Sequence, residues 1–209
     1  MEEHRSKNES AIAAARARSA ERERLLTLRR NVDQDIRARV AEHAGLVVDA
    51  VVAARERAGL TPPRIAFYWP IRAEPSLIEL MKATHARGVT TLLPVVVSKG
   101  AALVFRAFAP GVPMQAGAWK IPEPAIGPDV APDVLFAPLV GFDDRGYRLG
   151  NGGGFYDRTL AALRPRPRAI GIGFECLRMD SIEPQPHDEA MDLIVTEQRL
   201  TLEQVATWW

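Results

Sequence analysis

Residues 134–163 read VLFAPLVGFDDRGYRLGNGGGFYDRTLAAL. The stretch opens on a continuous apolar run, which is typical of a strand buried in a sheet. A polar turn, a glycine cluster and a helix-like segment follow it. In open α/β sheets, ligands bind just beyond the carboxyl ends of the strands. The order of strand, glycine-rich loop and helix therefore predicts a ligand-binding loop in an α/β fold.

The glycine cluster at 150 and 152–154 is suited to holding phosphate. Glycine tolerates positive φ and close backbone approach, so consecutive N–H groups can converge on phosphate oxygens at the positive end of the following helix. Arg148 can add a charged fork to the same oxygens, and Asp157 is placed to hold a magnesium ion. A Walker A loop and a dinucleotide signature both have a different pattern. Taken alone, the glycines fit a flexible turn equally well.

The flanking sequence predicts alternating strands and helices. Residues 10–57 are rich in Ala, Arg, Glu and Leu with a single glycine, so we expect at least two helices there. Ser76 and Glu79 suggest a capping box at the start of a helix over 76–87. A hairpin around 98–100 and a long surface loop over 110–132 are expected. The remaining predictions are strands at 65–69, 90–97, 134–140, 169–173 and 193–196, and helices at 155–163 and 201–208.

Together these elements indicate a three-layer α/β/α fold with a mostly parallel sheet and an N-terminal helical segment. We expect residues 1–209 to form a single domain, because this length suits one ordinary core. A hydrophobic content of 47% and a charged content of 25% are those of a globular protein.

The charge and cysteine content point to a cytoplasmic protein. The single cysteine, Cys176, excludes an intrachain disulfide and suits a reducing compartment. We see neither a signal peptide nor an apolar run long enough for a membrane span, so no membrane partner is expected. The formal net charge of +1 gives no strong attraction to nucleic acid. The arginines of the first forty residues are interleaved with acidic residues, which favours a salt-bridged helix surface over an RNA-binding face.

The whole string from Gly141 to Arg158 resembles the signature of the 5-formyltetrahydrofolate cyclo-ligase family, whose members are also called methenyltetrahydrofolate synthetases. Further segments resemble the family in the right order, from about Ile65 to Glu197. They include Tyr-Trp-Pro at 68–70, Trp-Lys-Ile-Pro-Glu-Pro at 119–124, and a His-Asp-x-x-x-Asp pattern at 187–192.

The resemblance implies an enzyme that uses ATP and Mg²⁺ to convert 5-formyltetrahydrofolate into 5,10-methenyltetrahydrofolate, ADP and phosphate. In this reaction the formyl oxygen attacks the γ-phosphate, N10 closes the ring, and phosphate leaves. Its partner is thus a small-molecule substrate. The sequence indicates no oligomeric state.

The resemblance also implies site residues. Arg148 and Tyr156 would be catalytic, with Tyr156 steering the formyl group. Trp69, Glu74 and Trp119 would bind the folate, and Asp157 and Asp192 would bind magnesium. From the residues alone, the two tryptophans fit a core, Glu74 fits the start of a turn, and Asp192 fits a surface charge. ATP binding would fall to Arg18, Arg22, Arg148, Leu149, Gly150, Asn151, Gly152, Gly153, Gly154, Phe155 and Tyr156.

Two departures from the family pattern keep an alternative open. Arg18 and Arg22 stand where the family usually has a lysine and an arginine, and Phe155 replaces the first tyrosine of the pattern Tyr-Tyr-Asp. An arginine fork does not freely replace an ammonium group. A divergent paralogue that binds folate or nucleotide without efficient turnover is therefore the alternative hypothesis. A nucleic-acid-associated protein with an arginine-rich N-terminus is a third.

Overall fold

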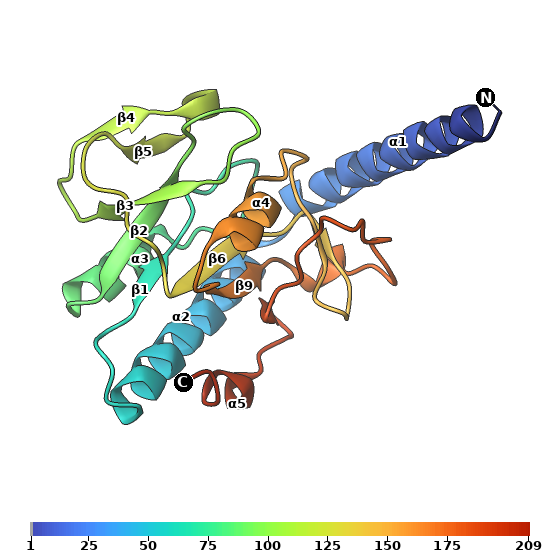
Figure 1. The fold of residues 1–209 in the computed structure, drawn as a ribbon. Helices are drawn as coiled ribbons and strands as arrows, with labels where there is room; N and C mark the ends of the chain where they lie inside the picture. Colours follow the sequence, from blue (N-terminus) through green and yellow to red (C-terminus); the bar gives the residue numbers. More distant parts are fainter. Residues whose placement is uncertain (1) are drawn as a thin grey trace.

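The computed structural model describes the backbone of residues 2–209 and the side chains of residues 15–209. A six-stranded sheet lies at the centre of the molecule (Figure 1). Its strands are β1 (Arg64–Ala66), β2 (Thr90–Val95), β3 (Val104–Phe108), β6 (Val134–Pro138), β9 (Arg168–Ile172) and β10 (Leu193–Val195). They follow the order β10-β9-β6-β1-β2-β3, in which every neighbouring pair is parallel except β2 and β3.

The two faces of this sheet are both buried. Successive side chains of a strand point to opposite faces, so neighbouring residues enter different cores. Phe136 and Ile170 belong to one hydrophobic cluster, whereas Leu135 and Ala169 belong to another. Burial on both faces explains why the parallel strands read as continuous apolar runs in the sequence.

Helices cover each face and complete three layers. The first cluster joins residues of α1 (Glu2–Arg30), α2 (Gln34–Arg57), α3 (Ile78–Ala86) and α5 (Leu202–Val205). Leu160 of α4 (Phe155–Ala162) belongs to the second cluster. The α/β/α fold class, the mostly parallel sheet and the N-terminal helices are thus confirmed. In the described part of the chain, no helix combines the length and apolarity needed to cross a membrane.

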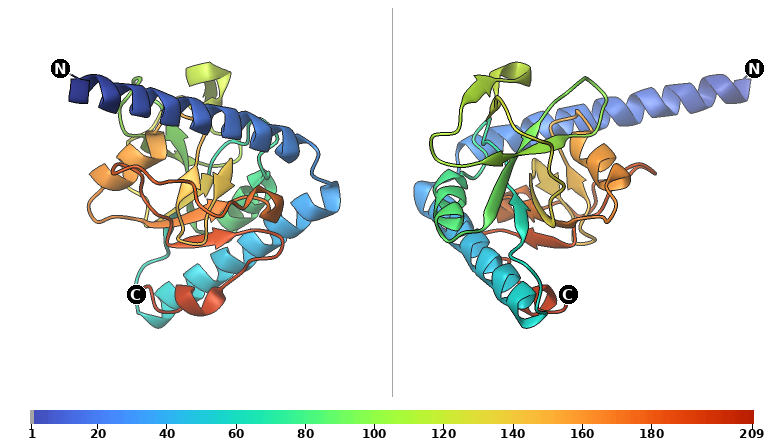
Figure 2. Two further views of the ribbon diagram at one scale, coloured as in Figure 1. Left: turned by 90° about the vertical axis from the view of Figure 1, so that its right-hand side faces the viewer. Right: turned by 60° about the vertical axis from the view of Figure 1, so that its left-hand side comes forward.

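The first helix, α1, reaches the core with its second half. Its N-terminal part extends away from the sheet (Figures 1 and 2), while Leu25, Leu26 and Arg29 are buried. Gly141 allows this approach, because a Cβ at that position would lie 2.7 Å from Leu25 Cδ1. The docked half of α1 therefore lies beside the chain that follows β6.

Two small hairpins decorate the sheet. β4 (Met114–Ala116) and β5 (Pro122–Pro124) pair antiparallel, with the short helix η1 (Ala118–Lys120) between them. The stretch predicted as a loop over 110–132 therefore contains a hairpin. β7 (Gly141–Phe142) pairs antiparallel with β8 (Arg148–Leu149) and leads directly into the glycine cluster. A second short helix, η2 (Glu175–Leu177), follows β9.

Several element ends differ from the sequence-based expectations. The predicted capping box is wrong: α3 begins at Ile78 after Leu77, and no side chain caps it. The hairpin between β2 and β3 is confirmed. The strand predicted over 65–69 ends at Ala66, the last residue paired with β2 and β6. The helix predicted over 201–208 is limited to residues 202–205, and Trp208 is buried instead.

Candidate active site

The glycine-rich loop over 150–154 joins β8 to α4, beyond the carboxyl end of β6. Gly152 and Gly154 have φ of +94° and +63°, where a side chain would strain the backbone. Among the described residues, no acceptor takes the backbone N–H groups of 151–154. Residues 151–153 are also exposed. The loop thus presents consecutive amides that are available to an anion.

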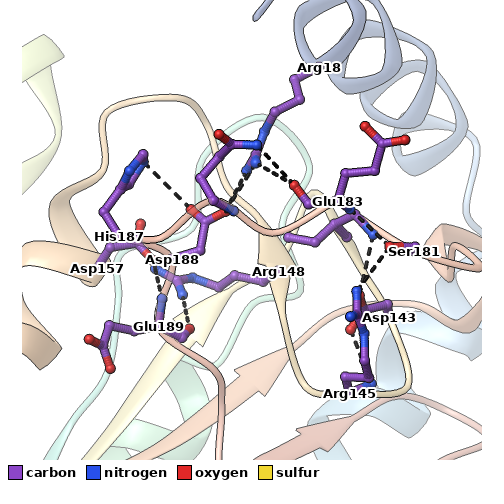
Figure 3. Close-up of polar contacts among 12 residues, drawn as sticks. Arg18, Asp143, Arg145, Arg148, Asp157, Ser181, Glu183, His187, Asp188 and Glu189 are labelled. Atoms are coloured by element: carbon purple, nitrogen blue, oxygen red, sulfur yellow. Dashed lines mark hydrogen bonds and ion pairs between the residues drawn. The ribbon is translucent and has the colours of Figure 1, made fainter. Parts of the chain in front are cut away.

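Two arginines of α1, Arg18 and Arg22, lie in the same region as this loop. Arg22 Nε donates to the Gly150 carbonyl oxygen at 2.7 Å. Arg18 donates through Nη1 and Nη2 to Asp188 Oδ2 at 3.0 and 3.1 Å (Figure 3). A Cβ on Gly152 would lie 3.4 Å from Arg22 Cζ, so the helix and the loop are closely packed. The structure therefore places Arg22 at the loop and Arg18 against the segment 183–188.

Arg148 and Asp157 form an ion pair at the base of the loop. Arg148 Nη2 lies 3.0 Å from Asp157 Oδ1, and the arginine is buried. Glu189 ties the pair to the segment after β9: its carbonyl accepts from Arg148 Nη1 at 3.0 Å, and its N–H donates to Asp157 Oδ1 at 3.2 Å (Figure 3). No described residue bonds Asp157 Oδ2. That oxygen remains available to a cation.

Glu74 lies at the other side of the loop in a tight turn. Its Oε2 accepts from the Ile71 N–H at 2.9 Å, and its Oε1 accepts from Asn151 Nδ2 at 3.1 Å. Burial raises the pKa of this carboxyl, although the Ile71 N–H and the nearby Arg29 guanidinium oppose the rise. The hydrogen bond from Asn151 therefore connects Glu74, the carboxylate predicted to bind folate, directly to the loop predicted to bind phosphate.

Aromatic side chains flank the same region. Trp119 is 67% exposed and packs edge-to-face on Phe155, with ring centroids 5.5 Å apart. Tyr156 is half-buried, and burial raises the pKa of its phenol, so the hydroxyl remains a hydrogen-bond donor at neutral pH. Trp69 packs partly buried against the core cluster that includes α1 and α2. The structure thus brings Trp119 to the loop and gives Trp69 a packing role.

Asp192 lies elsewhere. It precedes β10, and its carboxylate accepts from Arg166 at 2.8 Å, from Arg168 at 3.3 Å and from the Ala169 N–H at 2.8 Å. These partners sit at the amino ends of β9 and β10, and no hydrogen bond joins Asp192 to the loop among the described residues. The structure therefore does not bring Asp192 together with Asp157: its carboxylate is bonded to residues around the start of β9.

Two residues that sequence reasoning did not assign contact the predicted site residues. Asp188 bonds Arg18 and immediately precedes Glu189, which contacts both Arg148 and Asp157. Arg29 is fully buried and lies 3.8 Å from Glu74. A signal for Arg29 did exist, because residues 18, 22, 25 and 29 recur every three or four positions and so share one face of α1. For Asp188, the motif alone did not distinguish it from Asp192.

Comparisons with known proteins agree on one family. The model of the 5-formyltetrahydrofolate cyclo-ligase family matches residues 14–197. The 5-formyltetrahydrofolate cyclo-ligase of Mycolicibacterium smegmatis is 30% identical over 192 residues, which cover 88% of this chain and 95% of that protein. The enzyme of the same name from Haemophilus influenzae is 33% identical over 140 residues, or 63% and 74% of the two chains.

A solved structure resembles the whole fold. The NMR structure of Aquifex aeolicus 5,10-methenyltetrahydrofolate synthetase matches with a TM-score of 0.70 and 27% sequence identity. The match covers 88% of this chain and 92% of the Aquifex chain.

Proposed function

Because this chain belongs to the 5-formyltetrahydrofolate cyclo-ligase family, we propose that it converts 5-formyltetrahydrofolate and ATP into 5,10-methenyltetrahydrofolate, ADP and phosphate. The observation that carries the proposal is the set of backbone amides over 151–154 that have no acceptor among the described residues. Arg22 of α1 and Arg148 of β8 lie next to this loop. A loop of free amides with arginines beside it suits a triphosphate.

The folate would lie on the Glu74 side of the loop. An ionised carboxylate accepts hydrogen bonds only, which matches the N–H and amino donors of a pterin edge. Trp119 offers an exposed flat surface for an aromatic ring, next to Phe155. The hydrogen bond between Asn151 and Glu74 would keep the two substrates next to each other. We retain Trp69 as a proposed lining residue, on the resemblance alone.

The chemistry requires an amide oxygen to become a leaving group. The formyl oxygen would attack the γ-phosphorus, and the bond to ADP would break. N10 would then attack the formyl carbon and lose its proton to water, and the C–O bond to phosphate would break. Catalysis of this kind depends on alignment and charge neutralisation. Arg148, Arg22 and the loop amides would hold the phosphates, and the protonated Tyr156 hydroxyl would orient the formyl oxygen.

Magnesium would be shared between the protein and the nucleotide. The described residues contain no group of three His, Cys, Asp or Glu side chains that could hold a metal ion. Mg²⁺ at phosphate sites uses one or two carboxylates together with phosphate oxygens. Asp157, with its free Oδ2, fits this role, and we propose Asp188 rather than Asp192 as the second carboxylate. The ion would neutralise phosphate charge.

The reaction itself tests this proposal. Purified protein with ATP, Mg²⁺ and 5-formyltetrahydrofolate should develop the long-wavelength ultraviolet absorbance of the methenyl product, and omission of any one component should abolish the signal. If both substrates bind and no product forms, the proposal fails and the non-catalytic paralogue is supported. Introducing Arg18→Lys with Phe155→Tyr would then show whether those departures are responsible. We further propose a single domain and a cytoplasmic location, consistent with the lone cysteine.

A further inference from the structure

The turn that carries Glu74 has a strained backbone. Arg72 and Ala73 have φ of +48° and +60°, although neither is glycine. Non-glycine residues rarely adopt this left-handed region, and they do so at functional sites when surrounding contacts hold them there. The turn is short, since the Glu74 N–H donates back to the Ile71 carbonyl at 2.9 Å.

Two arginines from neighbouring helices hold the strained residues. Arg29 Nε of α1 donates to the Arg72 carbonyl at 3.0 Å, and Arg37 Nη1 of α2 donates to the Ala73 carbonyl at 2.9 Å. Arg29 Nη1 also donates to the Leu139 carbonyl just beyond β6, at 3.0 Å. Arg29 thus fixes the Glu74 turn to the strand that leads into the glycine-rich loop.

Arg29 also supplies a positive charge that does not depend on Glu74. Its Nη1 lies 3.8 Å from Glu74 Oε1, and both side chains are buried. The carbonyls of Arg72 and Leu139 hold the guanidinium. The charge of Arg29 therefore stays in place even when the Glu74 carboxylate reorients to bind a ligand. Arg29 Nη2 has no hydrogen-bond partner among the described residues. Leaving a charged donor unpaired in a core is costly, so the arginine is not explained by packing alone.

We propose that Arg29 is a positioning residue that fixes the Glu74 turn and keeps the Glu74 carboxylate ionised for the folate. This inference rests on the proposed function and deepens it. The other groups that face Glu74 are Arg72 in the same turn, Tyr68 after β1 and Tyr156 of α4, with Arg37 of α2 beyond the turn. Arg29 differs from these groups because it is a fully buried cation that comes from another element, α1.

Arg29→Met and Arg29→Lys separate the charge from the shape of the side chain. Arg30→Met is the matched control, because Arg30 is the next residue of α1 and is exposed. An opposite charge at this range lowers a carboxyl pKa by about one to three units. In Arg29→Met we therefore expect the KM for folate to rise roughly tenfold at the acidic end of the profile and to fall as the pH rises, with kcat little changed. Loss of the contacts to the turn adds an increase that does not depend on pH. Arg29→Lys should keep the pH profile of the wild type.

A KM increase in Arg29→Met that is equal at every pH would refute the role of the Arg29 charge and leave only its contacts to the turn. A pH profile of Arg29→Lys that shifts upward would refute that role as well. If Arg29→Met does not fold, the profile of Arg29→Lys still decides the matter. Combining Arg29→Met with Glu74→Gln gives a further check. The pH-dependent part of the effect should disappear in the double variant, because no carboxyl remains to titrate.

Stability as a function of pH distinguishes a failure of this inference from a failure of the proposed function. The folded pKa of Glu74 is raised, so its charged form costs stability as the pH rises from the ordinary value of 4.5 through the folded pKa. Arg29→Met should extend the fall of the urea midpoint to higher pH, and Arg30→Met should not. This holds without folate. If the wild type lacks activity but the urea midpoints of Arg29→Met and Arg30→Met differ in this way, the proposed function is refuted and the coupling between Arg29 and Glu74 stands. Identical midpoint profiles would refute the coupling.

Discussion

Two arginine–aspartate clusters are connected by the short segment 189–192. They differ in how completely their hydrogen bonds are satisfied. At the amino ends of β9 and β10, Asp192 has both carboxylate oxygens bonded, to Arg166, Arg168 and the Ala169 N–H. At the loop, Asp157 keeps Oδ2 free, and four neighbouring amides have no acceptor among the described residues.

The difference shows that charge alone does not mark a functional site. A saturated cluster stabilises the fold, because every buried polar group already has its partner. An unsaturated cluster can bind a ligand without first breaking its own bonds, which is the preorganisation that catalysis requires.

The largest expected effect is on turnover in Asp157→Asn. The substitution keeps the shape of the side chain but removes the charge that would hold Mg²⁺, so kcat should fall roughly 100-fold or more. Steady-state kinetics over a magnesium titration measures this effect. A variant with near-normal kcat at ordinary magnesium would show that the free carboxylate oxygen has no part in the reaction.

Asp192→Asn should behave in the opposite way. It weakens two ion pairs and a backbone bond at the sheet edge, so the free energy of unfolding should fall by about 1–3 kcal/mol, while kcat stays near that of the wild type. Urea unfolding together with the same kinetics checks both parts. If instead turnover collapses and stability is kept, Asp192 belongs to the catalytic site after all.

Gly152→Ala should weaken nucleotide binding. Its φ of +94° strains any residue with a side chain, and the new Cβ would lie 3.4 Å from Arg22 Cζ. The loop conformation that binds the nucleotide should therefore cost at least ~1 kcal/mol more free energy. Gly111→Ala is the control, since Gly111 has a φ of +87° but nothing within 4 Å of the added carbon. Calorimetry should find weaker ATP binding in the first variant alone. Equal losses in both would point to general strain.

The smallest effect is expected for Trp119→Ala. The indole is 67% exposed, so its removal should leave the unfolding midpoint unchanged and weaken folate binding by about 1 kcal/mol. Ile126→Ala, at another residue that is 64% exposed, serves as the control and should alter neither quantity. Unchanged folate affinity in Trp119→Ala would remove this residue from the proposed pocket.

Much of the fold was predictable, because both faces of the sheet are buried and its strands read as apolar runs. Where the sequence lacks such a pattern, prediction failed. The hairpin of β4 and β5 has three-residue strands, one of which contains Pro122 and Pro124, so neither alternation nor propensity indicates it. Ser76 has the residue type of a cap, but tertiary packing starts α3 at Ile78 without using it.

The site was predictable where one contiguous stretch carries it, as from Arg148 to Asp157. It was not predictable where the fold joins distant segments. The contact of Arg18 with Asp188 spans 170 positions, and Arg29 meets Glu74 through a turn whose positive φ values no residue type announces. Which of two aspartates meets Arg18 depends on the path of the chain after β9, and motif spacing does not contain that information.

The most direct test of the central claim is to follow the backbone amides themselves. Nuclear magnetic resonance of labelled protein during titration with ATP and Mg²⁺ should shift the N–H signals of Asn151, Gly152, Gly153 and Gly154 and slow their hydrogen exchange, while the amide of Ala169 beside Asp192 stays unchanged. If the nucleotide saturates the protein and these four signals do not move, the glycine-rich loop is not the phosphate site and the account is contradicted.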